Sequence, residues 1–134
     1  MDSIKKLINN PDLGKLIFRL FVGLSMAFAH GLGKLPPPEQ LVQGVASMGF
    51  PAAGVFAWLA GLSEFAGGLL IAVGLFTRHS ALFLGFTMAT AGFVAHSADP
   101  FRVKELAFLY LASCVLLFFA GAGKYSLDRI IRKK

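Results

Sequence analysis

The chain has 134 residues, of which 56% are hydrophobic and only 15% are charged, well under the roughly 25% of a soluble domain. A soluble protein this small could not bury so much apolar surface in one core, and disordered chains are poor in apolar residues, so both classes are excluded. The single cysteine, Cys114, excludes an internal disulfide, a C-x-x-C redox pair and a thiolate zinc site.

Four apolar segments follow in chain order, each near the length of about 20 residues that crosses a bilayer. They cover about 13–34, 51–76, 79–97 and 102–122. Asn10 is a candidate N-cap for the first helix, with Pro11 at its first position. We therefore predict an all-α integral membrane four-helix bundle that forms one domain over residues 1–134. A cleavable signal peptide is the alternative for the first segment, because Ala27-Phe28-Ala29 resembles a cleavage site.

The basic residues are divided unequally between the two ends of these segments. If both termini and the Thr77-Arg78 turn share one side, that side holds ten of the 13 Lys and Arg residues, and the other holds Lys34, Arg102 and Lys104. Cytoplasmic loops carry the excess of positive charge, so we predict that both termini are cytoplasmic. The net charge of +6 is then explained by topology and by anionic lipid, and no nucleic acid is expected.

Two shorter stretches lie outside the predicted spans. The loop over 35–50 begins with three prolines, and Leu41, Val45 and Met48 then recur at helical spacing. This pattern predicts a short helix on the outer membrane surface. Residues 130–134 form a basic interfacial tail, and Gly121-Ala122-Gly123-Lys124 is interpreted as a helix C-terminus because the rest of a phosphate-loop pattern is missing.

Small residues recur in the second and third segments. Close packing of helices in lipid depends on such residues, since lipid offers no hydrophobic drive for association. We predict one small-residue packing face from the following glycines and alanines: Ala57, Ala60, Gly61, Ala66, Gly67, Gly68, Ala72, Gly74, Gly85, Ala89 and Gly92.

Glu64, in the middle of the second segment, is the strongest candidate for a functional residue. A carboxylate at membrane depth must be paired, protonated or exposed to a polar cavity. One interpretation is a structural ion pair with Arg19 or Lys34. The other is a ligand-binding or proton-handling role, in which Glu64 and His30 act as catalytic groups.

Further polar residues are candidates for a ligand-binding pocket near the outer side. Arg19, His30 and Lys34 fall along one stripe of the first helix, and Arg19 either extends to the interface or pairs with Glu64. His96 ends the third helix and Glu105 begins the fourth. Arg19, His30, Lys34, Glu64, His96 and Glu105 are thus the predicted ligand-binding set. The alternative is that each of the outer residues merely lies in the wet interface.

Other ligands were weighed against this pocket. His30 and His96 are the residue type that ligates haem, and with Glu64 or Glu105 they would suit a metal, but no spacing motif supports either group, so no metal site is predicted. Aromatic residues such as Phe65, Phe86, Phe93 and Phe108 either face lipid or line a groove for an isoprenoid tail.

Several motifs together resemble the DoxX family of small bacterial membrane proteins. They are His30-Gly31-Leu32-Gly33-Lys34, Gly49-Phe50-Pro51, Glu64-Phe65-Ala66-Gly67-Gly68, Gly74-Leu75-Phe76-Thr77-Arg78, Lys104-Glu105-Leu106-Ala107 and the exit from Gly121 to Asp128. The resemblance implies a four-helix protein of the bacterial inner membrane. It also implies quinone or membrane redox partners, since relatives are linked to a thiosulfate:quinone oxidoreductase and to redox-stress complexes.

Three functions remain open at this point. The first is an accessory or assembly subunit of a quinone-linked membrane redox complex, with no intrinsic cofactor and with other membrane subunits as partners. The second is a quinone-binding oxidoreductase that acts itself, with His30 or Lys34 bound to the head group and Glu64 exchanging protons. The third is a small transporter or proton pathway formed by a homo-oligomer.

Overall fold

The computed structural model describes residues 1–132 and is built from helices, with no strand in that part of the chain. Lys133 and Lys134, the end of the predicted basic tail, lie outside the described residues. The elements in order are α1 (Asp2–Ile8), α2 (Pro11–Ser25), the π-helix η1 (Met26–Gly31), the 3₁₀ helix η2 (Leu32–Lys34), α3 (Glu39–Ser47), α4 (Ala53–Val73), α5 (Thr77–Thr90), the π-helix η3 (Ala91–Ala95), α6 (Phe101–Ala120) and α7 (Leu127–Arg132).

Three helical stretches are long and apolar enough to cross a bilayer: Pro11–Lys34, Ala53–Val73 and Phe101–Ala120. The predicted span over 79–97 corresponds to α5 and η3, which are helical from Thr77 to Ala95. The second span is shorter than predicted because the chain turns at Gly74 and Phe76, whose φ angles are 73° and 48°. Helix α1, which precedes the first span, was not predicted.

The first span starts as the sequence indicates but does not stay a regular α-helix. The Asn10 side chain accepts a hydrogen bond from the Leu13 amide at 3.0 Å, and Pro11 is the first helical residue. At Met26 the α-helix gives way to the π-helix and then to a 3₁₀ turn that ends at Lys34. Arg19 and Lys34 both contact α4, but His30, which lies in the π-helix, contacts Tyr110 of α6 instead. A π-helix changes the number of residues per turn, so the predicted stripe of three residues is broken at His30.

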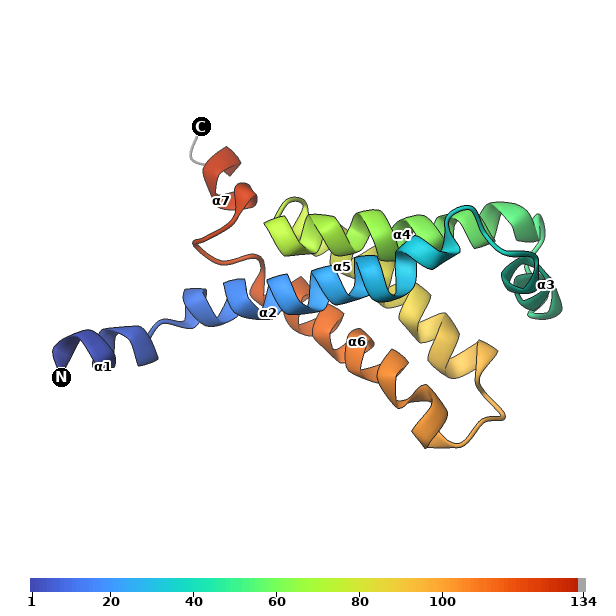
Figure 1. Ribbon diagram of the computed structural model, residues 1–134, viewed down its shortest axis with the longest axis horizontal. Coiled ribbons are helices and arrows are strands. Elements are labelled where there is room, and N and C mark those ends of the chain that lie inside the picture. The colour runs from blue at the N-terminus through green and yellow to red at the C-terminus, as the bar shows by residue number, and fades with distance from the viewer. Residues whose placement is uncertain (133–134) are drawn as a thin grey trace.

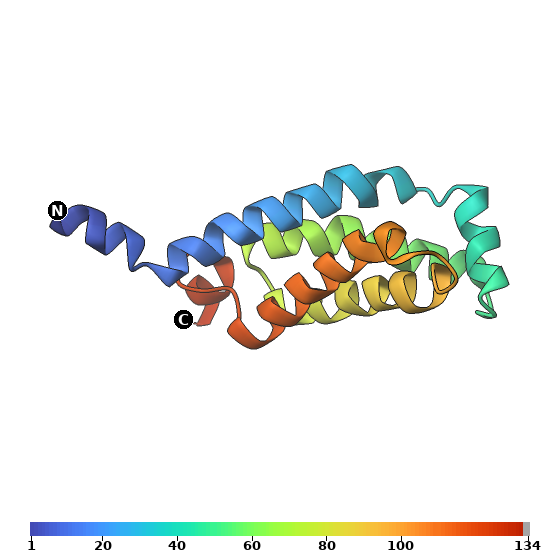
Figure 2. The ribbon, with the colours of Figure 1, turned by 90° about the horizontal axis from the view of Figure 1, so that it is seen from below.

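The long helices run alternately back and forth, in the order α2, α4, α5, α6 (Figures 1 and 2). Helix α2 packs on α4, and α5 packs on both α4 and α6. Both termini lie toward one end of the molecule and α3 lies at the other end, as both views show. The ends of the chain are thus separated from the α3 loop by the length of the helices.

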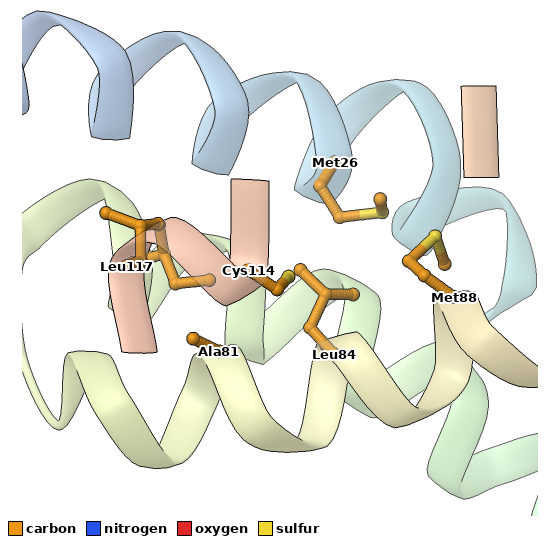
Figure 3. Packing of buried hydrophobic residues seen from close by; sticks show 7 residues of the cluster. Met26, Ala81, Leu84, Met88, Cys114 and Leu117 are labelled. Atoms are coloured by element: carbon orange, nitrogen blue, oxygen red, sulfur yellow. The ribbon is translucent and has the colours of Figure 1, made fainter. Parts of the chain in front are cut away.

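The core is a small cluster of aliphatic and sulfur-containing side chains between these helices (Figure 3). Met26 comes from η1, Ile71 from α4, Leu84 and Met88 from α5, and Cys114 from α6. Most other large apolar side chains are exposed, which suits a surface that faces lipid.

The short helix predicted in the 35–50 loop is present as α3, from Glu39 to Ser47. Val45 is buried and α3 packs on α4, whereas Leu41 and Met48 are half-buried. Apolar residues at this spacing therefore cover the start of α4.

The predicted common face of small residues divides into two separate contacts. Gly61 and Gly68 of α4 face the first span, because a Cβ at either would fall within 3.0 Å of its atoms. Gly85 of α5 and Gly92 of η3 instead face Cys114 and Phe108 of α6. The expectation of one shared face was wrong because α5 packs between two neighbours and uses a different side for each.

Candidate functional site

Glu64 forms an ion pair with Lys34, one of the two partners considered. The Lys34 ammonium lies 2.7 Å from Oε1 and 2.8 Å from Oε2, so it donates to both carboxylate oxygens. The two side chains differ sharply in exposure, at 2% for Glu64 and 33% for Lys34. The carboxylate is therefore hidden inside the protein, and the lysine is the member of the pair that a ligand would meet.

Two glycines allow the backbones that carry this pair to approach. A Cβ on Gly31 would overlap the backbone of α4, with the Glu64 carbonyl carbon 2.7 Å away. A Cβ on Gly61 would lie 2.9 Å from the Lys34 carbonyl oxygen and 2.8 Å from a methyl group of Leu35. Residues one turn before Glu64 and one turn before Lys34 must both be small for the pair to form.

His30 lies in the π-helix beside Tyr110 of α6. The two rings meet edge to face with their centroids 5.6 Å apart. The first span, α4 and α6 thus bring a lysine, a carboxylate, a histidine and a tyrosine into one region, which we call the Glu64 cluster (Lys34, Glu64, His30, Tyr110).

Neither His96 nor Glu105 is hydrogen-bonded or ion-paired to the Glu64 cluster within residues 1–132. His96 Nδ1 is instead 2.7 Å from a carboxylate oxygen of Asp99, three residues later. Glu105 is exposed on the first turn of α6, beside Lys104, whose ammonium donates to the Ser97 carbonyl oxygen at 3.4 Å. The part of these two residues in a ligand-binding pocket stays a prediction.

Arg19 neither reaches the surface nor pairs with Glu64, so both interpretations of it were wrong. Its side chain is completely buried, and Nη1 donates to the carbonyl oxygens of Ile71 and Ala72, each at 3.3 Å. Nη2 donates to the Tyr125 carbonyl oxygen at 2.5 Å. Seven residues, about two helical turns, separate Glu64 from Ile71 on α4, which places the arginine toward the other end of that helix.

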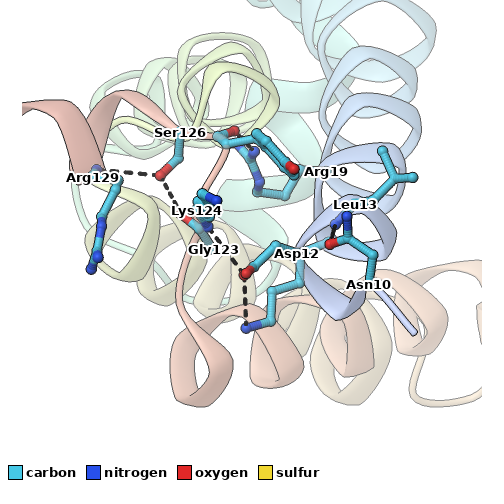
Figure 4. Close-up of polar contacts among 10 residues, drawn as sticks. Asn10, Asp12, Leu13, Arg19, Gly123, Lys124, Ser126 and Arg129 are labelled. Carbon is cyan, nitrogen blue, oxygen red and sulfur yellow. Dashed lines mark hydrogen bonds and ion pairs between the residues drawn. The ribbon is translucent and has the colours of Figure 1, made fainter. Parts of the chain in front are cut away.

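Arg19 belongs to a network that fastens the C-terminal segment to the first span (Figure 4). The Asp12 carboxylate accepts a hydrogen bond from the Lys124 amide at 3.1 Å. The Ser126 hydroxyl donates to the Gly123 carbonyl oxygen at 2.7 Å and accepts from the Arg129 amide at 3.3 Å, which caps α7. The Asp12–Lys124 and Arg19–Tyr125 bonds join segments more than a hundred residues apart in the chain.

Helix α7 also caps the start of α5. The Asp128 carboxylate accepts hydrogen bonds from the backbone amides of Phe76 and Thr77, at 2.8 and 3.0 Å. The Asp128 amide in turn donates to the Gly74 carbonyl oxygen at 2.8 Å. A carboxylate at a helix N-terminus satisfies free amides and interacts favourably with the helix dipole.

The four phenylalanines proposed for an isoprenoid groove do not form one group. Phe93 and Phe108 contact each other with ring centroids 5.0 Å apart, whereas Phe65 pairs with Phe28. Phe86 is 67% exposed. Within residues 1–132 no three His, Cys, Asp or Glu side chains are arranged to hold a metal ion.

The sequence reasoning missed Tyr110, Tyr125 and Asp128. Tyr110 could have been found, because it is a polar-tipped aromatic residue inside an apolar span. Tyr125 contributes only its carbonyl oxygen, which every residue has, and Asp128 acts at a helix distant in sequence. Neither of these contacts leaves a local pattern.

Comparison with known proteins gives a consistent result. The family model described as DoxX matches residues 14–97. The chain is 38% identical to the inner membrane protein YqjF of Escherichia coli over 92% of this chain and 95% of that protein. It is 33% identical to an uncharacterized protein of Haemophilus influenzae, over 95% and 100% of the two chains. It is 28% identical to the "Putative oxidoreductase CatD" of Bacillus subtilis, over 91% and 90%. No solved structure matches the chain.

These relatives and the three apolar helices agree on location. The Escherichia coli relative is named as an inner membrane protein, and it aligns along almost the whole chain. The helices are long enough to cross a bilayer. The chain is therefore a multi-pass protein of the bacterial inner membrane.

Proposed function

Because the chain belongs to the DoxX family, we propose that it is an accessory or assembly subunit of a quinone-linked membrane redox complex. The observation that carries this proposal is the Lys34–Glu64 pair, in which a hidden carboxylate holds a lysine whose side chain is one-third exposed. The name of the Bacillus subtilis relative, "Putative oxidoreductase CatD", supports the redox class.

The proposal includes four membrane crossings with both termini in the cytoplasm. Three spans are long and apolar, and α5 with η3 supplies the fourth. Both termini lie toward one end of the molecule, as an even number of crossings requires (Figure 1). The basic residues concentrate at that same end, which is typical of a cytoplasmic side.

The pair would fix the end of the first span against α4 for assembly with a partner. A lysine that contacts both carboxylate oxygens restricts the rotation and the sliding of η2 on α4. Helix α6, by contrast, has two buried residues, Cys114 and Leu117, and leaves most of its apolar surface to lipid or to a further subunit.

Native mass spectrometry of the chain, extracted gently from its own membrane, tests the accessory role. We expect a second protein at fixed stoichiometry, and its chemistry would name the complex. A chain that stays alone, or bound to copies of itself, in mild detergent and in native lipid would contradict the accessory role.

A second candidate is that the Glu64 cluster binds a quinone head group itself. Lys34 has three N–H donors and uses two on Glu64, so one remains for a quinone carbonyl oxygen. His30 and the Tyr110 hydroxyl offer further hydrogen bonds in the same region. When bound, a quinone would supply the two-electron chemistry, whereas these side chains would orient the head group and exchange protons.

Quinone that co-purifies with the chain can be extracted and quantified for two matched lysine variants. We expect Lys34→Met to lower bound quinone about tenfold, since one charge-assisted hydrogen bond is worth ~1.5 kcal/mol or more. Lys104→Met removes the same charge from a lysine outside the Glu64 cluster and should leave bound quinone unchanged. Equal quinone content in the two variants would exclude the cluster as the binding site.

A further inference from the structure

A cavity lies at the end of the molecule that carries the termini. It has a volume of about 540 Å³ and is bounded by the start of α5, the loop after α6 and helix α7. The lining side chains include Thr77, Arg78, His79, Lys124, Arg129 and Arg132. The cavity is separate from the Glu64 cluster, since the two share no residue.

The charge of this cavity is positive, and its two carboxylates are already engaged. Asp128 accepts from the amides of Phe76 and Thr77, and Asp12 accepts from the Lys124 amide. Within residues 1–132 the ion pairs involve only Lys15, Lys34 and His96. Arg78, Lys124, Arg129 and Arg132 therefore form none in that part of the chain. Three guanidinium groups and one ammonium group are therefore left for an anion from outside the chain.

A buried hydroxyl in the wall of the cavity points to the same kind of ligand. Thr77 is completely buried, and within the described residues its Oγ1 has no hydrogen-bond partner. A buried donor without a partner costs about 1–3 kcal/mol, so such groups normally have one. A ligand with oxygen acceptors would satisfy the hydroxyl and the guanidinium groups together, and phosphate oxygens match both.

The position of the cavity identifies the source of that phosphate. Helices α4 and α6 end at Val73 and Ala120 and α5 begins at Thr77, so the cavity lies where long apolar helices leave the hydrocarbon. Two large apolar side chains among its lining residues, Phe76 and Ile131, are 59% and 56% exposed. Apolar side chains beside arginines suit a lipid, whose acyl chains continue into the bilayer, better than a free ion.

We propose that this cavity binds the phosphate head group of an anionic phospholipid from the leaflet on the side of the termini. Arg78 and Arg129 contact the phosphate oxygens, and the Thr77 hydroxyl donates to one of them. Bound there, the lipid joins the α4–α5 turn to α7.

Competition between lipids in nanodiscs tests this site. The chain is reconstituted in phosphatidylcholine that contains a minority of phosphatidylglycerol, and lipid adducts are counted by native mass spectrometry. We expect one phosphatidylglycerol to be retained per chain. Replacing Arg78 and Arg129 together by glutamine should lower its affinity about tenfold, because each basic residue near a membrane surface contributes to the binding of anionic lipid.

The matched control is the replacement of Lys5 and Lys6 by glutamine. These replacements remove two positive charges, as many as in the test variant. They lie on α1, which has no buried residue and does not line the cavity. Retention within a factor of about two of the unmodified chain is expected for this control. Arg78 and Arg129 are exposed, so their variants should keep the helical circular dichroism spectrum and provide a folded protein for the comparison.

Three results would overturn the proposal. Equal loss of lipid in the two double variants would mean that the attraction is diffuse surface charge. Equal retention of phosphatidylcholine and phosphatidylglycerol would mean that no anionic site exists. Displacement of the lipid by inorganic phosphate, with a phosphate adduct on the protein, would assign the cavity to a soluble anion.

Discussion

At the scale of single residues, the two buried charges Glu64 and Arg19 are stabilised in different ways, one by an ion pair and the other by carbonyl oxygens. Glu64 receives a full counter-charge from Lys34 at 2.7 Å. Arg19 is surrounded by carbonyl oxygens and has no carboxylate in hydrogen-bond contact within the described residues. Carbonyl dipoles can solvate a cation whose planar group offers several donors, which is a property of arginine rather than of lysine. The Lys34–Glu64 pair joins the first span to α4, and Arg19 joins the C-terminal segment at Tyr125 to the first span.

Replacing Arg19 by methionine should destabilise the protein strongly. The change removes hydrogen bonds to the Ile71, Ala72 and Tyr125 carbonyl oxygens, and we expect the free energy of unfolding in mixed micelles to fall by about 3 kcal/mol. Lys15→Met is the matched control on the same helix, since Lys15 is partly exposed and 4.0 Å from Asp12. That control should change the free energy by less than about 0.5 kcal/mol. Similar losses in both variants would contradict the role given to Arg19.

A double-mutant cycle on Lys34 and Glu64 should show an asymmetry set by burial. Lys34→Met leaves the hidden carboxylate without a partner and should cost about 3 kcal/mol or more, whereas Glu64→Gln leaves a lysine that can reach solvent and should cost less. The double variant should recover part of the loss, with a coupling energy of ~1–3 kcal/mol. The measurement is again the free energy of unfolding. Additive losses would mean that the pair does not stabilise the fold.

Glu105→Gln serves as the control for that cycle. Glu105 is exposed and has no ion pair within the described residues. Its replacement should leave the free energy of unfolding within about 0.5 kcal/mol.

At the scale of elements, the contact between α2 and α4 depends on which glycine faces the neighbouring helix. A Cβ on Gly68 would lie 2.7 Å from the Gly23 carbonyl oxygen and 2.9 Å from the Ala27 amide nitrogen. A Cβ on the adjacent Gly67 would meet no atom within 4 Å. The absence of a side chain at Gly68 therefore sets the distance between the two helices, as in other membrane proteins that pack through small residues.

Alanine at these two neighbouring positions should have opposite effects. Gly68→Ala forces α2 and α4 apart and should lower the free energy of unfolding by about 1–3 kcal/mol. Gly67→Ala adds the same methyl group in open space and should raise stability by up to ~1 kcal/mol, since alanine is the better helix former. Thermal unfolding of both variants in one detergent checks the sign. If Gly67→Ala lowers the stability instead, the added methyl group must collide with neighbouring atoms, which would contradict this prediction.

The helices were predictable from the sequence to within a few residues, but their irregular parts were not. Apolar runs, the Asn10 cap and the spacing of Leu41, Val45 and Met48 depend on local chemistry, which sequence patterns record. The π-helix at Met26 leaves no such pattern. It turns His30 toward Tyr110, so the set of residues around Glu64 was predicted only in part. Rotation of a helix about its axis is decided by packing against its neighbours, which one sequence does not reveal.

At the scale of the whole molecule, different polar sites lie at the two ends of the helices. The half toward α3 holds the Lys34–Glu64 pair and the His30–Tyr110 contact, since Lys34 ends the first span just before α3. The end with the termini holds Arg19, Asp128 and the basic cavity. The α5 helix connects the two, and its capping by Asp128 ties its start to α7.

Labelling of single cysteines tests whether α5 completes a fourth crossing. In a Cys114→Ala background, Ser3→Cys and Arg132→Cys should react with a membrane-impermeant maleimide from the cytoplasmic side, and Ser47→Cys should react from the opposite side. All three positions are exposed. Three crossings would place positions 3 and 132 on opposite sides of the membrane, and that result would overturn the proposed topology.

The bond from Arg19 to Tyr125 also constrains the order of events during synthesis. The two residues are 106 positions apart, so the carbonyl oxygen that Arg19 binds is synthesised long after the first span. Until the ribosome has synthesised Tyr125, the Nη2 donor of Arg19 lacks this hydrogen-bond acceptor in the membrane. Insertion of the first helix and closure of the finished protein are therefore separate steps. Between these two steps, an insertase or a neighbouring subunit can supply hydrogen-bond acceptors for Arg19.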